Sequence, residues 1–261
     1  VEMTMGGAMP MTMRTEQQSY STTSGARVQL RLVPAPDVHL DLGAEVTNWA
    51  AENSRWTEQS GAMGSNRFEF RTCPGVDSLD AGLFAQGEIP LLGRLGAALG
   101  GRIDHVVRQA DGAPTTRDWI GSGNAGLRLT LPHGLGARVS VGYGYRIPNP
   151  TELYGLALKP DGFVYRGNAE LDTETNRNVE ASLTLDRTRL SASATVFRTD
   201  LKGLITPVLA EDEVIVGKPV RSYANLADSR LTGASGSFQW RPLQTLTLSG
   251  TASYTHGEDL A

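Results

Sequence analysis

Apolar and polar residues alternate along most of this chain, and the alternation predicts β-strands. The pattern is clearest in the segment 135–146, where odd positions are apolar or aromatic and even positions are small or charged. A period of two residues places one set of side chains on each face of a strand. The segment 178–185 repeats this pattern after a polar stretch. Similar alternation occurs at 26–32, 38–47, 79–86, 95–104, 124–131, 190–196, 234–240 and 245–254.

The connections between these segments alternate in length. Short turns are expected at 34–37, 90–94, 132–134, 186–189 and 241–243, and longer loops at 51–77, 111–118, 148–175 and 210–220. The apolar face also carries aromatic residues near strand ends, namely Tyr143, Tyr145, Phe238, Trp240 and Tyr254. Short turns on one side, long loops on the other and aromatic residues at strand ends are typical of an outer-membrane barrel. Strands of about ten residues are long enough for a tilted membrane crossing.

The fold class predicted is therefore all-β, an antiparallel transmembrane β-barrel. The chain supplies about 10–11 strands, which makes the barrel partial. A soluble antiparallel sandwich, for example in an adhesive module, is the alternative. Its turns would have no reason to alternate between short and long, and its strands are usually shorter.

Composition agrees with this prediction and excludes several functions. Hydrophobic residues make up 39% of the 261 residues, 30 residues are glycine, and no run approaches the ~20 apolar residues of a membrane helix. The formal net charge of −4 argues against a nucleic-acid partner. The single cysteine excludes an internal disulfide and a cysteine-rich metal knuckle. The chain begins at Val1 without a signal segment, and we interpret it as an internal piece of a longer precursor.

No catalytic arrangement stands out, so we expect a protein that is not an enzyme. The Gly-Ser-Gly at 121–123 lies within a predicted strand, whereas a hydrolase nucleophile needs a strand-to-helix turn. Gly142 and Gly144 have no helix after them and therefore do not form a nucleotide-binding turn. No cofactor is expected either.

One motif resembles the barrel of TonB-dependent outer-membrane transporters. In that family a strand ends in Arg-x-Pro-x-x-x-Glu-Leu-Tyr/Phe. The matching residues here are Arg146, Pro148, Glu152, Leu153 and Tyr154.

Two further motifs extend the resemblance. A Gly-Asn-x-x-Leu-x-x-Glu element leads into the next strand, with Ala169 where the family usually has proline. Its residues here are Gly167, Asn168, Leu171, Glu174 and, further on, Glu180. The family's Asn-x-x-x-Ala-x-x-x-Gly entry to a later strand has a counterpart with a shorter Asn-to-Ala spacing. The residues are Tyr223, Asn225, Ala227 and Gly233.

The resemblance covers residues 26–254 and implies a place in the bacterial outer membrane, in contact with lipid. It implies a larger barrel of about 22 strands closed by an N-terminal plug, with transport driven by the periplasmic TonB complex through that plug. Residues 1–261 would then be a fragment of the barrel domain, without the plug and without the C-terminal strand. Inward-facing charges such as Arg102, Arg128 and Arg138 would pair with the plug more often than with cargo. A passive porin is the alternative transporter.

Five of the six methionines lie in the first thirteen residues, and their clustering suggests a metal site. They are Met3, Met5, Met9, Met11 and Met13. Thioether sulfur is a soft ligand that suits Cu(I). Such a segment before an alternating strand resembles the copper-receptor branch of the family. Gly6, Gly7 and Pro10 favour a loop around these methionines rather than a continuous strand.

Copper is the cargo that the methionines favour, and a ferric siderophore or another metal chelate is the alternative. The methionines could also be ordinary apolar residues, because methionine fills gaps well. Additional ligand candidates are Met63, Cys73 and His39, with His105 a further possibility. For His39 the simpler interpretation is a polar residue of the barrel lumen, and for Cys73 a lone thiol in a loop.

Overall fold

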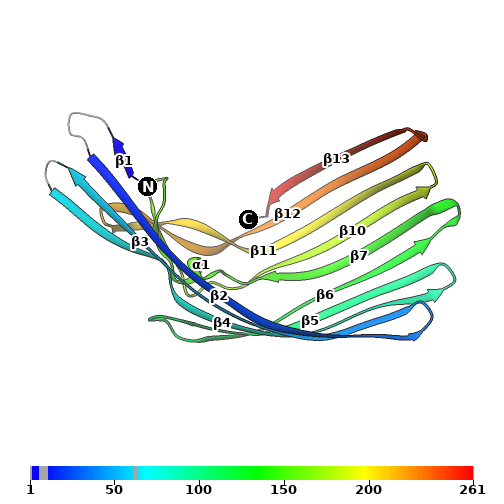
Figure 1. The fold of residues 1–261 in the computed structure, drawn as a ribbon, viewed down its shortest axis with the longest axis horizontal. Helices are drawn as coiled ribbons and strands as arrows, with labels where there is room; N and C mark the ends of the chain where they lie inside the picture. Colours follow the sequence, from blue (N-terminus) through cyan, green and yellow to red (C-terminus); the bar gives the residue numbers. More distant parts are fainter. Residues whose placement is uncertain (1, 6–10, 62–63, 261) are drawn as a thin grey trace.

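The computed structural model describes residues 2–5, 11–61 and 64–260 and shows one thirteen-stranded sheet curved into an open wall (Figure 1). Neighbouring strands of the wall are antiparallel and follow the order of the chain, apart from a detour in the loop after β7. The ten long strands, β2 to β7 and β10 to β13, agree with the predicted count and fold class. Within the described ranges, no helix is long and apolar enough to span a membrane.

The strand bounds are β1 Glu2–Met5, β2 Met11–Ala35, β3 Val38–Gly61, β4 Gly64–Leu92, β5 Leu95–Ala110, β6 Thr116–Thr130, β7 Leu135–Arg146, β8 Leu156–Leu158, β9 Val164–Arg166, β10 Glu174–Arg187, β11 Leu190–Ile215, β12 Lys218–Leu243 and β13 Leu246–Asp259. A single 3-10 turn, η1 (Pro132–Gly134), connects β6 to β7, and a short helix, α1 (Pro150–Tyr154), follows β7.

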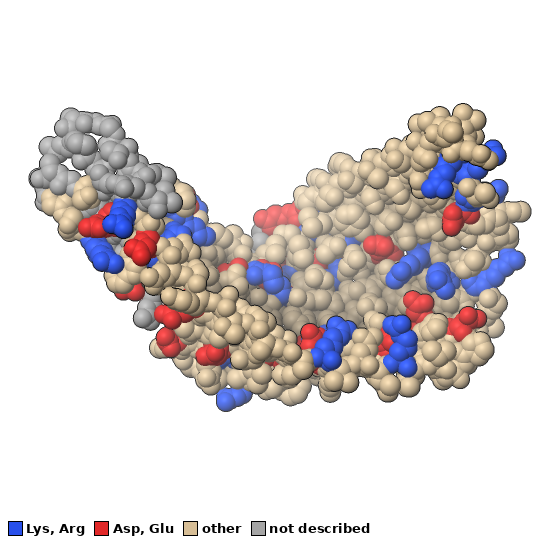
Figure 2. Space-filling model, in the orientation of Figure 1, with Lys and Arg blue, Asp and Glu red and all other residues tan. Residues whose placement is uncertain are grey.

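The two faces of the wall differ as the alternation predicts. The outward face exposes large apolar side chains, such as Leu127 (50%), Val139 (52%) and Leu183 (62%). The hollowed face carries Arg, Lys, Asp and Glu side chains (Figure 2). Because so extensive an exposed apolar face is unfavourable in water, this surface is suited to lipid.

Buried apolar side chains are few among the described residues and lie at one end of the wall, where the loop after β7 meets it. They are Cys73, Val76, Val106, Leu153, Ala157, Val164, Tyr165, Val220 and Tyr223. We refer to this end as the long-loop end and to the opposite end, where β2–β3, β4–β5, β6–β7, β10–β11 and β12–β13 are joined, as the short-turn end.

Two segments predicted to be loops, 51–77 and 210–220, are instead largely strands among the described residues. β2, β3 and β4 contain 25, 24 and 29 residues, far more than the roughly 9–11 residues of a membrane crossing. The β3–β4 ladder continues to Gly61 and Gly64, and β11 and β12 pair as far as Ile215 and Lys218. In these extensions the alternation of apolar and polar residues fades, because both faces of the strands lie beyond the apolar band and can carry polar residues. Backbone pairing, which the sequence pattern does not report, maintains the strands.

Tyr145 is a further correction. It was predicted on the outward face, but its hydroxyl donates to Asp104 Oδ2 at 2.6 Å, and Asp104 is buried. The β6–β7 ladder ends at Gly123 and Tyr143, so the last residues of β7 are not held in register with β6. Pairing of β7 with β10 nevertheless continues in register to Arg146 and Glu174.

Candidate functional site

The loop of residues 147–173, here called the crossing loop, connects strands that are distant in the wall. Its α1 and β8 contact β4, and its β9 pairs in parallel with β12 at Val164–Val220, Tyr165–Arg221 and Arg166–Ser222. Five strands separate β4 from β12 in the sheet order. Arg55 of β3 also donates to Leu158 O at 3.4 Å. The crossing loop therefore bridges the hollowed face at the long-loop end.

Helix α1 begins at a well-formed cap. Asn149 Oδ1 accepts from Glu152 N at 2.9 Å, and Glu152 Oε2 accepts from Asn149 N at 2.8 Å. This capping box satisfies two backbone donors at the helix start, and Pro150 fits the first helical position because it lacks an N–H. The sequence motif Pro-x-x-x-Glu thus encodes a tight change of direction after β7.

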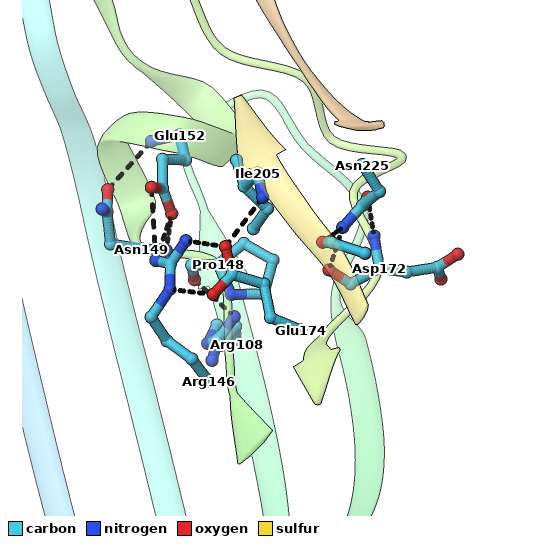
Figure 3. Close-up of polar contacts among 10 residues, drawn as sticks. Arg108, Arg146, Pro148, Asn149, Glu152, Asp172, Glu174, Ile205 and Asn225 are labelled. Carbon is cyan, nitrogen blue, oxygen red and sulfur yellow. Dashed lines mark hydrogen bonds and ion pairs between the residues drawn. The ribbon is translucent and has the colours of Figure 1, made fainter. Parts of the chain in front are cut away.

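Arg146 connects α1 to the wall (Figure 3). Its Nη1 donates to Glu152 Oε2 at 2.9 Å, and its Nε donates to Glu174 Oε2 at 2.6 Å. Glu174 in turn accepts from the backbone N–H of Ile205 at 2.7 Å. One guanidinium and two carboxylates therefore join β7, α1, β10 and β11.

Asn225 of β12 fixes the end of the crossing loop. Its Oδ1 accepts from Asp172 N at 2.8 Å, and its Nδ2 donates to Asp172 O at 3.0 Å and to Gly203 O at 2.7 Å (Figure 3). Gly203 has φ +64° and lies at a break in the β11–β12 register, a conformation that glycine adopts at little cost. Asn168 also donates to Tyr223 O, at 2.9 Å.

The residues that carry the family resemblance thus come together in space. We call Arg146, Glu152, Asn168, Glu174 and Asn225 the loop anchor. Their side chains hold the crossing loop against the wall, so the described structure gives the three motifs a structural role. Glu180 and Gly233 lie elsewhere in the wall, and Gly233 leaves room for the ring of Phe197.

The hairpin of β8 and β9 is held by a cluster that the sequence did not reveal. Lys159 Nζ lies 3.8 Å from the ring centre of Tyr165, whose hydroxyl donates to Asp161 Oδ2 at 2.8 Å. Arg221 Nη1 donates to Tyr165 Oη at 3.1 Å and lies 3.6 Å from Asp161 Oδ2. These residues lie in a loop and at a strand end, where no periodic pattern marks them. Val164 and Val220 are fully buried beneath them.

The positive charges in this cluster favour the ionised form of the Asp161 side chain. Partial desolvation raises the pKa of Asp161, but the hydroxyl of Tyr165, the N–H of Phe163 and the cations Arg221 and Lys159 outweigh it. The net result is a pKa below the ordinary value of an aspartate.

Four of the five N-terminal methionines lie in strands of the sheet, Met3 and Met5 in β1 and Met11 and Met13 in β2. The β1–β2 ladder pairs Met3 with Met13 and Met5 with Met11. The backbone register thus places the four methionines at two positions of one ladder, separated by the pair Thr4–Thr12. Met9 and Met63 lie outside the described residues. The loop expected around Gly6, Gly7 and Pro10 falls on residues 6–10, which lie outside the described residues.

The other metal candidates lie apart from this group. Cys73 is buried, and its thiol faces the carbonyls of Ala51 and Pro74 at 3.9 and 3.5 Å. Burial and the nearby charge of Glu52 raise the pKa of Cys73, which disfavours the thiolate that binds metals. His39 lies at the short-turn end of β3, opposite Glu88. His105 stacks on Trp119 with ring centres 4.5 Å apart. Among the described residues, no group of three or more His, Cys, Asp or Glu could hold a metal ion.

Comparison with known proteins identifies this architecture. The family described as "TonB dependent receptor-like, beta-barrel" matches residues 5–260. The structure is similar to that of the copper transporter OprC, with a TM-score of 0.72 and 16% identity over 96% of this chain and 39% of that one. It is also similar to the siderophore receptor PirA from Pseudomonas aeruginosa, with a TM-score of 0.56 and 15% identity over 99% and 62% of the two chains. No curated protein matches the sequence.

A third similar structure is the ferric yersiniabactin uptake receptor FyuA from Yersinia pestis, with a TM-score of 0.63 and 15% identity over 99% and 38% of the two chains. The chain thus spans between 38% and 62% of the length of these solved structures. At such low identity the likeness concerns the fold alone.

Proposed function

Because the chain belongs to the TonB-dependent receptor family, of which it contains part of the β-barrel, we propose that the complete protein is an outer-membrane transporter that imports copper. Members of this family are outer-membrane barrels of Gram-negative bacteria and act as transporters rather than enzymes. The observation that carries the copper proposal is the ladder pairing of Met3 with Met13 and Met5 with Met11. Thioethers suit Cu(I) and are poor ligands for hard cations.

The position of the methionines supports capture from outside the cell. They lie at the far end of the extended ribbon formed by β1 to β4, well beyond the apolar band of the wall (Figure 1). Cys73 and His39 are not part of this proposed site, because they lie further along the strands. In the complete protein we expect the periplasmic TonB complex to drive import through the plug.

Import of an anionic metal chelate, such as a ferric siderophore, is the second candidate. The observation that favours it is the pair of cations Lys159 and Arg221 beside the aromatic rings of Phe163 and Tyr165 at the barrel mouth. Cations and aromatic rings together recognise planar anions. Within the cluster, however, Asp161 already offsets part of this positive charge.

Copper content of the complete protein, extracted from outer membranes, tests the proposal. The variant changes Met3, Met5, Met11 and Met13 to Leu, which conserves volume and removes sulfur. The matched control changes Thr4 and Thr12 to Ala, because these residues are paired between the methionines in the same ladder. We expect near-stoichiometric Cu(I) in the wild type and the threonine variant, and its loss in the methionine variant.

Equal and negligible copper in all three proteins would overturn the copper proposal. Uptake of a ferric chelate, measured in the same strains with and without TonB, would then decide for the second candidate. Cargo uptake that does not depend on TonB would instead indicate a passive porin.

A further inference from the structure

The outward face of the wall changes from apolar to charged on strands β10 to β12. These strands lie side by side, and β11 pairs with both neighbours without a break in register from Leu190 to Leu201 (Figure 1). Because successive residues of a strand point to opposite faces, Leu183, Val179 and Arg177 of β10 all lie on the outward face. The register therefore gives the order of the outward residues, row by row across the strands.

Three arginines lie just beyond the last apolar row. That row consists of Ala181, Val196, Ala234 and Tyr254, which are Cα partners across β10 to β13. One row further towards the long-loop end, Arg198 lies opposite Val179. Two rows further, Asp200 lies between Arg177 and Arg230. We call Arg177, Arg198 and Arg230 the outer arginine cluster.

The outer arginine cluster is only partly neutralised. Asp200 binds two of its members, with Oδ2 2.9 Å from Arg198 Nη2 and Oδ1 2.7 Å from Arg230 Nε. Arg177 is exposed, and so is Lys202, the next cation on this face of β11. Neither of these two side chains forms an ion pair or a side-chain hydrogen bond with the described part of the chain. The positive charge that remains favours an anion from outside the chain.

Two further carboxylates lie nearby but have other partners. Glu258 is the Cα partner of Arg230 on β13, and its Oε1 lies 3.5 Å from His256 Nε2. Asp228 Oδ1 accepts from Gly203 N at 3.1 Å, at the break in the β11–β12 register. Within the described ranges, neither carboxylate forms an ion pair with the outer arginine cluster.

The cluster lies at the depth of lipid headgroups. Rows on one face of a strand are about 6.7 Å apart, and a strand tilt of about 40° reduces this spacing to roughly 5 Å of depth. Arg198 therefore lies about 5 Å, and Arg177 and Arg230 about 10 Å, beyond the last apolar row. The headgroup layer on each side of a bilayer is about 5–8 Å thick, and long side chains can reach back into it.

Aromatic residues mark the same border. Tyr254 belongs to the last apolar row, and Tyr143 of β7 is the Cα partner of Arg177. Both tyrosines are exposed on the outward face. Aromatic girdles of outer-membrane barrels lie at the membrane interface. Charge and aromatic residues thus agree that the cluster faces lipid headgroups.

We propose that the outer arginine cluster binds the phosphate of an anionic membrane lipid whose acyl chains lie along the apolar face of β10 to β12. Guanidinium groups form short, charge-assisted hydrogen bonds with phosphate oxygens. The acyl chains would cover the exposed side chains of Val179 and Val196. A lipid fits better than free phosphate, because only a lipid joins a phosphate to an apolar tail and the arginines directly follow the apolar rows. The proposal does not depend on the cargo.

Lipid binding by the complete protein tests this proposal. Native mass spectrometry in detergent would compare bound phosphatidylglycerol, an anionic probe, with bound phosphatidylcholine, a zwitterionic one. Arg177→Gln breaks no ion pair of the described wall. One basic residue near an anionic surface contributes about fivefold in affinity, so we expect a loss of this size for phosphatidylglycerol and no change for phosphatidylcholine. Adding Lys202→Gln should increase the loss to about 25-fold.

Arg128→Gln is the matched control, because it removes the same charge from an exposed arginine on the hollowed face. This variant should bind phosphatidylglycerol like the wild type. Equal losses in Arg177→Gln and Arg128→Gln would overturn the proposal, since binding would then follow net charge alone. Equal binding of the two lipids by the wild type would also overturn it. Displacement of the lipid by an equal concentration of inorganic phosphate would indicate a site for the free anion and overturn the proposal as well.

Discussion

Glu174 illustrates how one side chain can serve several segments. Its carboxylate accepts from Arg146 and from the backbone N–H of Ile205, and the residue is only 9% exposed. A buried backbone donor that loses its acceptor costs free energy comparable to a lost hydrogen bond. Glu174 therefore stabilises both the crossing loop and the irregular part of β11.

Replacing Glu174 by Ala should loosen both segments. Hydrogen bonds that involve a charged group contribute about 1.5–3 kcal/mol each, so we expect a local loss of this order. Hydrogen exchange should become faster at the Ile205 amide and across residues 150–173. Glu170→Ala is the control, because the Glu170 side chain is exposed and forms no ion pair or side-chain hydrogen bond with the described part of the chain. Unchanged protection at Ile205 in the Glu174 variant would contradict this role.

The crossing loop depends on a close approach of two backbone segments. Gly167 N donates to Gly155 O at 2.7 Å, and an added Cβ at Gly167 would lie 2.5 Å from Tyr154 N. Backbone atoms cannot rotate away as a flexible side chain can. The glycine of the Gly-Asn motif is therefore required by the packing of this loop against α1.

Gly167→Ala should detach α1 from the β8–β9 hairpin. Forced overpacking costs about 1–3 kcal/mol, and we expect the cost to appear as faster proteolysis at residues 159–162. Gly96→Ala is the control, since the nearest atom to its added Cβ is Ile89 O at 3.6 Å, an ordinary contact. Equal proteolysis of the two variants would show that the loop can absorb the strain.

The two faces of the wall are suited to different surroundings, lipid on the apolar face and polar contents on the other. Val139 and Ser140 are neighbours on β7 that face opposite sides. Val139 lies in the apolar band beside Leu127, whereas Ser140 lies opposite Gly126 and Glu180. The two positions therefore report on the two environments.

Arginine at these positions should have opposite consequences. In Val139→Arg the charge faces the lipid, and we expect a loss of about 2–4 kcal/mol if the residue lies near the bilayer midplane. In Ser140→Arg the charge faces the lumen beside Glu180, so folding should change little. Folding into vesicles, followed by the heat-dependent gel shift, provides the measurement. Similar losses in both variants would contradict the assignment of the two faces.

The sequence predicted the wall well because alternation reports directly on two different environments. Leu127, Val139 and Leu183 are exposed on the outward face as predicted. The polar extensions of β2 to β4 were missed, since both their faces meet water and the alternation disappears. The motifs located the loop anchor, but the contact of Glu174 with Ile205 and of Asn225 with Gly203 depends on a break in strand register. The pairing of Met3 with Met13 likewise needs the backbone ladder.

The parallel pairing of β9 with β12 has a consequence for how the protein meets other chains. β13 pairs with β12 only from Ser229 onwards. Without the crossing loop, residues 220–222 of β12 would therefore present unpaired N–H and C=O groups at a strand edge. Such edges recruit strands from other proteins and lead to aggregation. Here β9 occupies that edge, and the new border is β8, which is three residues long and lies against β4. The crossing loop therefore also protects the long-loop end of the wall against strand addition by neighbouring polypeptides.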